Sequence, residues 1–376
     1  MVKKIVYFLF VSLFLFSCKQ KAELVVYNNT NIDRNNEIIE FCFCSVKDQI
    51  NFKKGDKIII LNKDNKQVPY QVLADNSTII FPASVNAKDS SVYTVMTGKP
   101  DSVVAKTFGR QVPERKDDFT WENDRIAFRM YGPALAPEKP SNGVDVWLKR
   151  TNRLIVDNFY KDDLASIQSY HVDNGEGLDC YKVGTTLGAG GIAPYINNRL
   201  FIGSNYDHFE IIDKGPLRTT FKLIYDSLTI GETSIKQTLI ISLDAGNQLN
   251  KAIVLYDDND ELIKHVAAGI FLHDSAGTKI AKPEKGFIAY AENAVSDAGI
   301  PAGRSFVGVY IPTPIESIII ENKHLLAIAK KRPHKSFVYF FGAGWSKWGF
   351  PTDDDWFDYM EQAAFKIKNP LQIIIR

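Results

Sequence analysis

The chain has 376 residues, and 45% of them are hydrophobic, which is enough apolar material for a large core. Its 45 Lys and Arg residues nearly balance its 44 Asp and Glu residues, so the formal net charge is +1. Because no long run carries a single sign, the sequence excludes the clustered basic face of a nucleic-acid-binding protein, and we expect no nucleic-acid partner.

The N-terminus has the pattern of an export signal. Lys3 and Lys4 precede an apolar run over residues 5–16, which is too short to span a bilayer comfortably. The following Leu-Phe-Ser-Cys, ending at Cys18, resembles the lipobox of bacterial lipoproteins, in which the Cys is acylated. We therefore predict a lipoprotein signal peptide over residues 1–18. We expect a periplasmic protein that a lipid on Cys18 holds at the outer membrane.

Short strand patterns dominate the rest of the chain. They are rich in β-branched and aromatic residues and are separated by Asn, Gly, Asp and Pro. They lie at residues 23–27, 57–61, 78–81, 92–95, 125–131, 218–225, 234–243, 250–256 and 306–311. Many strands with few helical repeats predict an all-β fold, a large antiparallel β-sandwich, built as a single domain over residues 19–376.

One helix is predicted near the C-terminus. Thr352 is a suitable N-cap, three Asp residues follow it, and Lys366 and Lys368 lie where the helix would end. Pro370 stops this helix, and residues 371–375 read as a final strand. A shorter helix is also predicted over residues 145–154.

The cysteines do not have the spacing of a zinc site, and no HxH or HExxH pattern accompanies His208, so we predict no metal and no cofactor. Cys42 and Cys44 alternate on one face of a strand-like stretch, where a direct bridge between them is geometrically awkward. Cys180 is either their partner or a small apolar core residue.

Three segments carry more polar and aromatic residues than a plain sandwich needs, and residues 113–125 are the first. In the strand pattern that follows, Arg125 and Arg129 share one face with Tyr131. Two guanidinium groups on one face suit a carboxylate. Glu122 and Asp124 would then orient them. The alternative is a solvated network of ion pairs among these residues.

The second segment is a glycine-dense loop over residues 170–191. His171 is its leading catalytic candidate, because histidine titrates near neutral pH, and Tyr170, Tyr181 and Lys182 accompany it. The glycines lack the spacing of a phosphate-binding loop. Elsewhere in the chain, His273 is a second acid–base candidate.

The third segment, residues 341–350, places Trp345 and Trp348 in a glycine-rich loop on either side of Lys347. Indole rings there can stack on the apolar face of a sugar or pack in the core. Lys347 is positioned to oppose a carboxylate.

Four stretches carry a family resemblance: WENDRIAFRMYGPAL, HVDNGEGLDCYKVGTTLGAGGIA, GPLRTTFKL and FGAGWSKWGFPTDDDWFDY. Together they resemble a family of galactose-mutarotase-like exported proteins, long known only as a domain of unknown function and encoded among bacterial polysaccharide-utilisation genes. The resemblance implies a supersandwich fold. The functional match within the family is with the ulvan oligosaccharide dehydratases, which implies a uronic-acid-containing oligosaccharide as partner.

Such a dehydratase removes the C5 proton and the C4 hydroxyl of a uronic acid, so it must neutralise the carboxylate and supply a base and an acid. We assign the carboxylate to Arg125 or Arg129, the base to His171 or Tyr170, and ring stacking to Trp345. Tyr181, Lys182 and His273 are the candidate acids. A polysaccharide lyase, a glycoside hydrolase with two carboxylates, or a non-catalytic glycan-binding lipoprotein are the alternatives.

Overall fold

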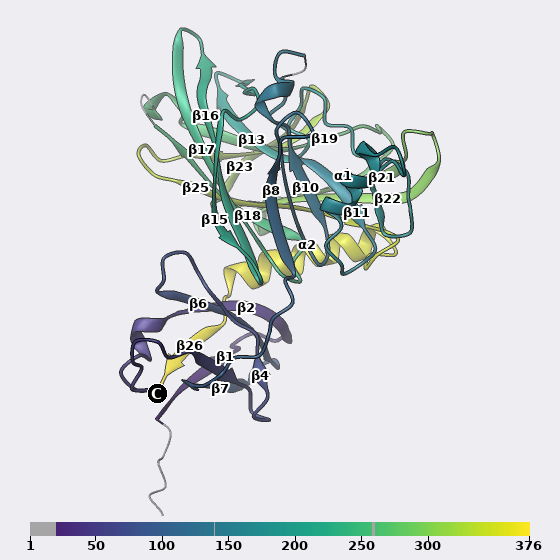
Figure 1. Cartoon of the computed structure of the whole chain (residues 1–376). Coiled ribbons are helices and arrows are strands. Elements are labelled where there is room, and N and C mark those ends of the chain that lie inside the picture. The colour runs from purple at the N-terminus through teal and green to yellow at the C-terminus, as the bar shows by residue number, and fades with distance from the viewer. Residues whose placement is uncertain (1–19, 139, 258–259) are drawn as a thin grey trace, which may run out of the picture.

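The computed structural model describes residues 20–138, 140–257 and 260–376. The predicted signal peptide and the lipid site at Cys18 lie outside the described residues. Within the described part of the chain, no helix has both the length and the apolar character needed to cross a membrane. These residues form a smaller lobe that contains residues 20 and 376, the first and last described, and a larger lobe above it (Figure 1).

The smaller lobe is a β-sandwich of two sheets. One sheet has the order β26 (Gln372–Ile375), β1 (Lys21–Tyr27), β7 (Ser90–Thr97), β3 (Ile58–Leu61) and β4 (Gln67–Val68). The other has the order β2 (Arg34–Cys42), β6 (Thr78–Val85) and β5 (Gln71–Val72). Leu24, Phe81 and Val95 belong to the core between them. The predicted C-terminal strand is confirmed, and it pairs with β1 at the beginning of the described chain.

Cys42 and Cys44 form a disulfide, which corrects the expectation that a bridge between them is awkward. The expectation assumed that both residues belong to one extended strand. Strand β2 ends at Cys42, and the chain turns into a short 3-10 helix over Phe43–Ser45. The turn brings the two Cα atoms to 5.2 Å, within the usual range for a disulfide.

The larger lobe is built on an eight-stranded sheet with every neighbouring pair antiparallel. Its order is β15 (His208–Lys214), β16 (Arg218–Ile230), β17 (Thr233–Asp244), β18 (Leu249–Tyr256), β25 (Phe337–Trp345), β22 (Pro301–Tyr310), β21 (Phe287–Val295) and β20 (Thr278–Lys282).

Two five-stranded sheets complete this lobe. One has the order β12 (Gly177–Asp179), β11 (Asp145–Lys149), β10 (Ala127–Met130), β9 (Asp118–Asn123) and β8 (Thr107–Val112). The other has the order β14 (Arg199–Leu200), β13 (Ala189–Ile196), β19 (His265–Phe271), β24 (His324–Lys330) and β23 (Ile315–Glu321). One continuous core joins all three sheets and includes Trp121, Phe221 and Val266. The predicted all-β antiparallel sandwich is confirmed.

Helix α2 (Asp353–Lys368) confirms the predicted C-terminal helix. The Thr352 hydroxyl accepts a hydrogen bond from the Asp355 backbone N–H, and the Asp355 carboxylate accepts one from the Thr352 N–H. This capping box satisfies two backbone donors at the start of the helix. Trp356 and Met360 are buried against the eight-stranded sheet beside Phe306.

The expected helix over residues 145–154 is wrong, because residues 145–149 form strand β11 and the helix α1 (Val156–Leu164) begins later. The carboxylate of Glu122, on β9, accepts hydrogen bonds from the backbone N–H groups of Ile155 and Val156. The cap of α1 is therefore supplied by a residue more than thirty positions away, a signal that local sequence does not contain.

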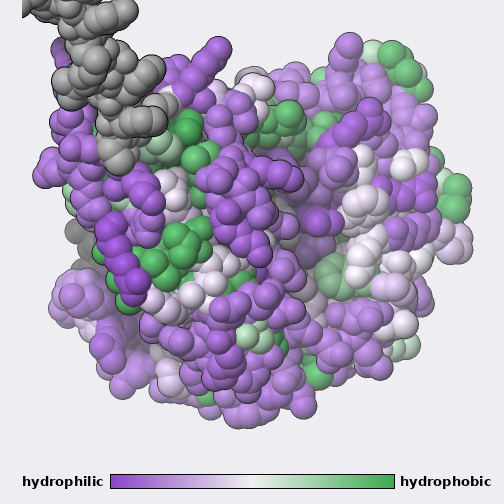
Figure 2. Space-filling model, turned by 90° about the horizontal axis from the view of Figure 1, so that it is seen from below, coloured by the Kyte–Doolittle hydropathy of each residue, from purple (hydrophilic) through white to green (hydrophobic). Residues whose placement is uncertain are grey.

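The two lobes have separate hydrophobic cores. The larger lobe begins near β8, and the chain returns to the smaller lobe through β26 after α2. The single domain over residues 19–376 stays a prediction. Seen from below, the surface is mostly hydrophilic with scattered hydrophobic patches (Figure 2), and Val72, Val92 and Ile374 are among the exposed apolar residues of the smaller lobe.

Candidate active site

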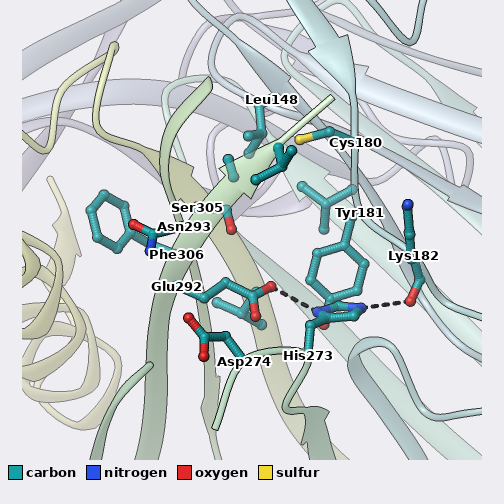
Figure 3. Close-up of a pocket in the computed structure, with 14 residues that line it drawn as sticks. Leu148, Cys180, Tyr181, Lys182, His273, Asp274, Glu292, Asn293, Ser305 and Phe306 are labelled. Carbon is teal, nitrogen blue, oxygen red and sulfur yellow. Dashed lines mark hydrogen bonds and ion pairs between the residues drawn. The ribbon is translucent and has the colours of Figure 1, made fainter. Parts of the chain in front are cut away.

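A cavity of about 370 Å³ opens between the five-stranded sheet that runs from β12 to β8 and the strands β21 and β22 (Figure 3). Val146 and Leu148 of β11 and Phe306 and Val307 of β22 supply its apolar walls. Its polar lining includes Cys180, Tyr181, Lys182, His273, Asp274, Glu292, Asn293 and Ser305. We call this cavity the β21–β22 pocket.

Strand pairing brings the polar residues together. Glu292 on β21 lies opposite Ser305 on β22, so both side chains reach the same part of the sheet. His273 lies two residues after the end of β19, and the ring of Tyr181 meets the His273 ring edge-to-face with 4.7 Å between centroids. Segments that are far apart in the sequence thus converge on one cavity.

His273 is held by hydrogen bonds at both ring nitrogens. Its Nδ1 lies 2.7 Å from Glu292 Oε1, and its Nε2 lies 2.6 Å from the backbone oxygen of Lys182. Since a carbonyl oxygen and a carboxylate only accept, both nitrogens carry a proton and the ring is an imidazolium cation. Burial lowers the pKa of His273, but the hydrogen bond and the charge of Glu292 outweigh it, and the net shift is upward.

Glu292 has only 6% of its side chain exposed, and its second carboxylate oxygen has no hydrogen-bond partner among the described residues. A buried carboxylate oxygen without a partner is costly. The first oxygen fixes the orientation of His273.

His171 lies next to this pocket. Its Nδ1 is 3.0 Å from the backbone oxygen of Asp179 and 3.5 Å from Asp297 Oδ2. In the neutral ring these acceptors favour the proton on Nδ1, and the lone pair is then on Nε2. Asp297 is also 3.9 Å from the Nζ atom of Lys182, which lines the pocket.

The two tyrosine candidates differ in access. Tyr170 is 2% exposed, its ring stacks on Trp147 at 4.8 Å, and its hydroxyl accepts a hydrogen bond from Arg115. Tyr170 therefore packs against the His171 ring and has no access to a substrate, which corrects its assignment as a base. Tyr181 lines the pocket, and burial raises the pKa of its hydroxyl well above the ordinary value, so that hydroxyl stays protonated.

Arg129 belongs to a buried ion cluster instead of a substrate clamp, which corrects the sequence expectation. Its Nη2 lies 2.5 Å from Asp145 Oδ2 and 2.7 Å from Asp179 Oδ2, and its side chain is 3% exposed. Burial raises the pKa of both carboxyl groups, against the opposing effect of Arg129. We call Arg129, Asp145 and Asp179 the buried arginine cluster.

The other members of the first segment also lie elsewhere. Arg125 is exposed and precedes β10, in a turn where its backbone N–H donates to Asn123 Oδ1. Glu122 is 1% exposed and pairs with Lys149 at 2.6 Å between Nζ and Oε2. Asp124 accepts a hydrogen bond from the Gly246 backbone. Neither carboxylate orients an arginine at the pocket.

Trp345 packs in the core with 1% of its surface exposed, and its Nε1 donates to the backbone oxygen of Ala302. The expected stacking platform at this residue is therefore wrong. Lys347 lies near the ring, 5.1 Å from its centroid, and pairs with Asp173 at 3.1 Å. Arg150 contacts the same carboxylate at 3.0 Å, so Lys347 belongs to a surface cluster beside the His171 loop.

Sequence analysis missed Glu292 and Asp297. Glu292 is the only charged residue in the otherwise apolar and amide-bearing strand FIAYAENAV, and that isolation was a usable signal. Asp297 lies in an ordinary turn, and nothing local marks it. Among the residues described, no group of three or more His, Cys, Asp and Glu side chains has an arrangement that could hold a metal ion.

Comparison with known proteins gives a family and a fold. The model of a family described as a domain of unknown function (DUF4861) matches residues 26–373. The uncharacterized protein P7 of Formosa agariphila is 29% identical over 398 residues, which cover 98% of each chain. The expected membership in a family of unknown function is confirmed, whereas the match with ulvan oligosaccharide dehydratases stays a prediction.

Two solved structures share the fold. An α-mannosidase from Enterococcus faecalis V583 superposes with a TM-score of 0.54 over 95% of this chain and 46% of its own length. A protein in the glycosyl hydrolase family 38 from Enterococcus faecalis gives a TM-score of 0.53, with coverage of 96% and 48%. Both are 8% identical in sequence. The chain therefore spans about half the length of these structures, and at this identity the likeness establishes the fold alone.

Proposed function

This chain belongs to the family of domains of unknown function DUF4861, and we propose that it is a carbohydrate-active lyase. It removes the C4 hydroxyl and the C5 proton from the non-reducing-end uronic acid of ulvan-type oligosaccharides, and leaves a 4,5-unsaturated uronyl end. The observation that carries the proposal is a pair of histidines, His273 in the lining of the β21–β22 pocket with both ring nitrogens hydrogen-bonded, and His171 beside the pocket with only its Nδ1 engaged within the described residues.

The pocket has features that suit the end of a uronate chain. Its volume of about 370 Å³ is at the low end for ligand sites, which favours a terminal sugar over the middle of a long polymer. The Lys182 side chain is 72% exposed, and its ammonium group, 3.9 Å from Asp297, can exchange that loose pair for a carboxylate in the pocket. Apolar walls from Val146, Leu148 and Phe306 fit the C–H face of a ring.

In the proposed reaction, His171 Nε2 takes the C5 proton, and the electron pair of the C–H bond forms the double bond between C4 and C5. The C4–O bond breaks, and the departing oxygen replaces the Lys182 backbone oxygen as the acceptor of the His273 Nε2 proton, takes that proton and leaves as water. Lys182 neutralises the substrate carboxylate while negative charge builds up on it. His171 ends protonated and His273 neutral, and exchange with solvent restores both.

Glu292 is a positioning residue in this scheme. Its carboxylate raises the pKa of His273 and so keeps the acid protonated near neutral pH. The two structural neighbours are an α-mannosidase and a protein in the glycosyl hydrolase family 38, which supports a carbohydrate as the substrate class. We further propose that the enzyme works in the periplasm, anchored through Cys18.

The test is incubation of the full chain with uronate-ended oligosaccharides from ulvan, followed by ultraviolet absorbance and product mass together. A new absorbance with loss of one water and no shortening is the expected result. Absorbance with shortening identifies a polysaccharide lyase, and shortening without absorbance identifies a hydrolase. Binding with no product identifies a glycan-binding protein and contradicts the proposal.

A further inference from the structure

One sheet of the smaller lobe turns a side to the surface that its core does not use. In the sheet from β26 to β4, Leu24, Tyr93 and Val95 point into the core between the two sheets. Side chains alternate along a strand, so the residues between these point the other way. In Figure 1 the strands β26, β1 and β7 lie on the side of the smaller lobe away from the larger lobe. We call the outward side of this sheet the outer face, and its apolar members include Val25, Tyr27, Leu61, Val92, Met96 and Ile374.

An apolar row crosses the outer face. Val25 on β1 lies opposite Ile374 on β26 and opposite Val92 on β7, so three aliphatic side chains stand next to one another. Val92 is 39% exposed and Ile374 is 48% exposed. The outward side of an antiparallel sheet usually carries polar residues, and contiguous apolar residues at a surface mark contact with another protein or a membrane. The row therefore indicates a partner other than water.

Charged and amphipathic side chains border the row. Lys21 and Glu23, at the start of β1, pair at 2.7 Å, and Arg376 donates a hydrogen bond to the hydroxyl of Tyr27. Met96 continues the apolar part of the face on β7 and is partly buried. Apolar side chains with charged neighbours are the composition of a surface that lies at the boundary between headgroups and acyl chains.

The proposed lipid anchor joins the chain at this lobe. Cys18 precedes residue 20, the first described, by two positions, and β1 begins at Lys21. An extended chain spans at most about 3.3–3.6 Å per residue, so the three steps from Cys18 to Lys21 cover no more than about 11 Å. A lipid on Cys18 would therefore hold the smaller lobe close to the membrane surface, because the intervening chain is too short to serve as a spacer.

We propose that the outer face docks on the lipid bilayer that holds the anchor, with Val92 and Ile374 at the headgroup boundary. The inference rests on the lipid at Cys18 proposed above and is independent of the elimination reaction. A short tether gives a second contact a high effective concentration, so a few aliphatic side chains suffice where they would not hold a free protein. Docking points the larger lobe, with the β21–β22 pocket, away from the membrane (Figure 1).

The test uses the full lipid-bearing chain on vesicles of phosphatidylethanolamine and phosphatidylglycerol, with a thiol introduced as Ile374→Cys or Ile320→Cys. Ile320 is the matched control, because it is also an exposed isoleucine, on β23 of the larger lobe. The measurement is the rate of modification by a water-soluble maleimide that does not cross membranes, with the modified peptide identified by mass spectrometry. Ile374→Cys should react about tenfold more slowly than Ile320→Cys, since a side chain at the headgroup boundary is shielded from the reagent.

A charge placed in the row tests the contact itself. Val92→Glu should restore fast modification of Ile374→Cys, because a carboxylate resists transfer into an apolar environment. Val72→Glu adds the same charge on β5 of the other sheet, where Val72 is also exposed, and should leave the slow rate unchanged. Circular dichroism checks that each variant is folded.

Three results would overturn the inference. A chain that does not float with the vesicles has no anchor, and the elimination assay in solution is unaffected by that result. Equal rates for Ile374→Cys and Ile320→Cys on a chain that does float would show that the outer face is free. A slow rate that persists in Val92→Glu would show that something other than the bilayer covers Ile374.

Discussion

The buried arginine cluster and the β21–β22 pocket both gather charged side chains, yet they differ in access. Arg129, Asp145 and Asp179 are each nearly fully buried beneath α1 and the stacked rings of Trp147 and Tyr170. His273 and Lys182 face a cavity that a ligand can enter. Ion pairing alone therefore does not identify a functional site in this molecule. Solvent access to the charged groups distinguishes the pocket from the buried arginine cluster.

The largest expected effect is that of His273→Gln on catalysis. Loss of the acid should lower kcat/KM for uronate-ended oligosaccharides by roughly 10²–10⁴-fold in a variant that circular dichroism shows to be folded. His265→Gln is the matched control, because His265 forms a comparable pair with Glu316, at 2.8 Å, away from the pocket lining. Equal losses in the two variants would show that the pocket has no special role.

The second prediction concerns the buried arginine cluster. Arg129→Leu leaves Asp145 and Asp179 buried without their cation, so the free energy of unfolding should fall by about 3–5 kcal/mol. Urea titration monitored by circular dichroism measures this change. A loss below about 0.5 kcal/mol, the usual range for surface substitutions, would mean that the cluster does not support the fold.

The pH dependence gives a smaller effect that distinguishes a positioning role from a merely structural one. Because Glu292 raises the pKa of His273, the activity should persist to higher pH in the natural chain than in Glu292→Gln. In the variant, the alkaline limb of the profile of kcat/KM against pH should therefore move to lower pH. A variant that loses activity equally at every pH would contradict this role for Glu292.

The same pair contributes to stability with a defined sign. The folded pKa of His273 lies above its ordinary value of 6.5, so the folded protein binds the proton more strongly than the unfolded chain. The contribution is fully present below about pH 6.5 and is lost as the pH rises through the folded pKa. The stability difference between the natural chain and Glu292→Gln should shrink over that window.

The smallest expected effect is that of Arg125→Ala. Its side chain is exposed, and the structure assigns it no hydrogen bond or ion pair within the described residues. Activity on uronate-ended oligosaccharides should change less than about twofold, and stability should stay within about 0.5 kcal/mol. A large loss of activity would place Arg125 among the substrate-binding residues and would contradict the assignment of substrate binding to the β21–β22 pocket.

Elements with local signals were predictable from the sequence. The strands were marked by β-branched and aromatic runs, and α2 was marked by the Thr352 cap and by Pro370. Helix α1 was missed because its N-terminal cap is the carboxylate of Glu122 on a distant strand. Burial and pairing at that distance are properties of the folded chain that a single sequence does not contain.

The candidate site was predictable only in part, because a sequence shows residue types but not which side chains the fold buries. Tyr181, Lys182 and His273 were chosen by residue type, and all three line one pocket. Arg129 was assigned by strand alternation, which does not show that the rings of Trp147 and Tyr170 cover its guanidinium group. Trp345 was assigned from its glycine-rich surroundings, although β25 continues to this residue and buries it.

The measurement that tests the central claim most directly is a proton NMR time course of a uronate-ended oligosaccharide with the full chain and with His273→Gln. We expect one new vinylic signal from H4 of the terminal sugar, no new reducing-end signal, and loss of the reaction in the variant. A new reducing-end signal without the vinylic one, or full activity in His273→Gln, would contradict it.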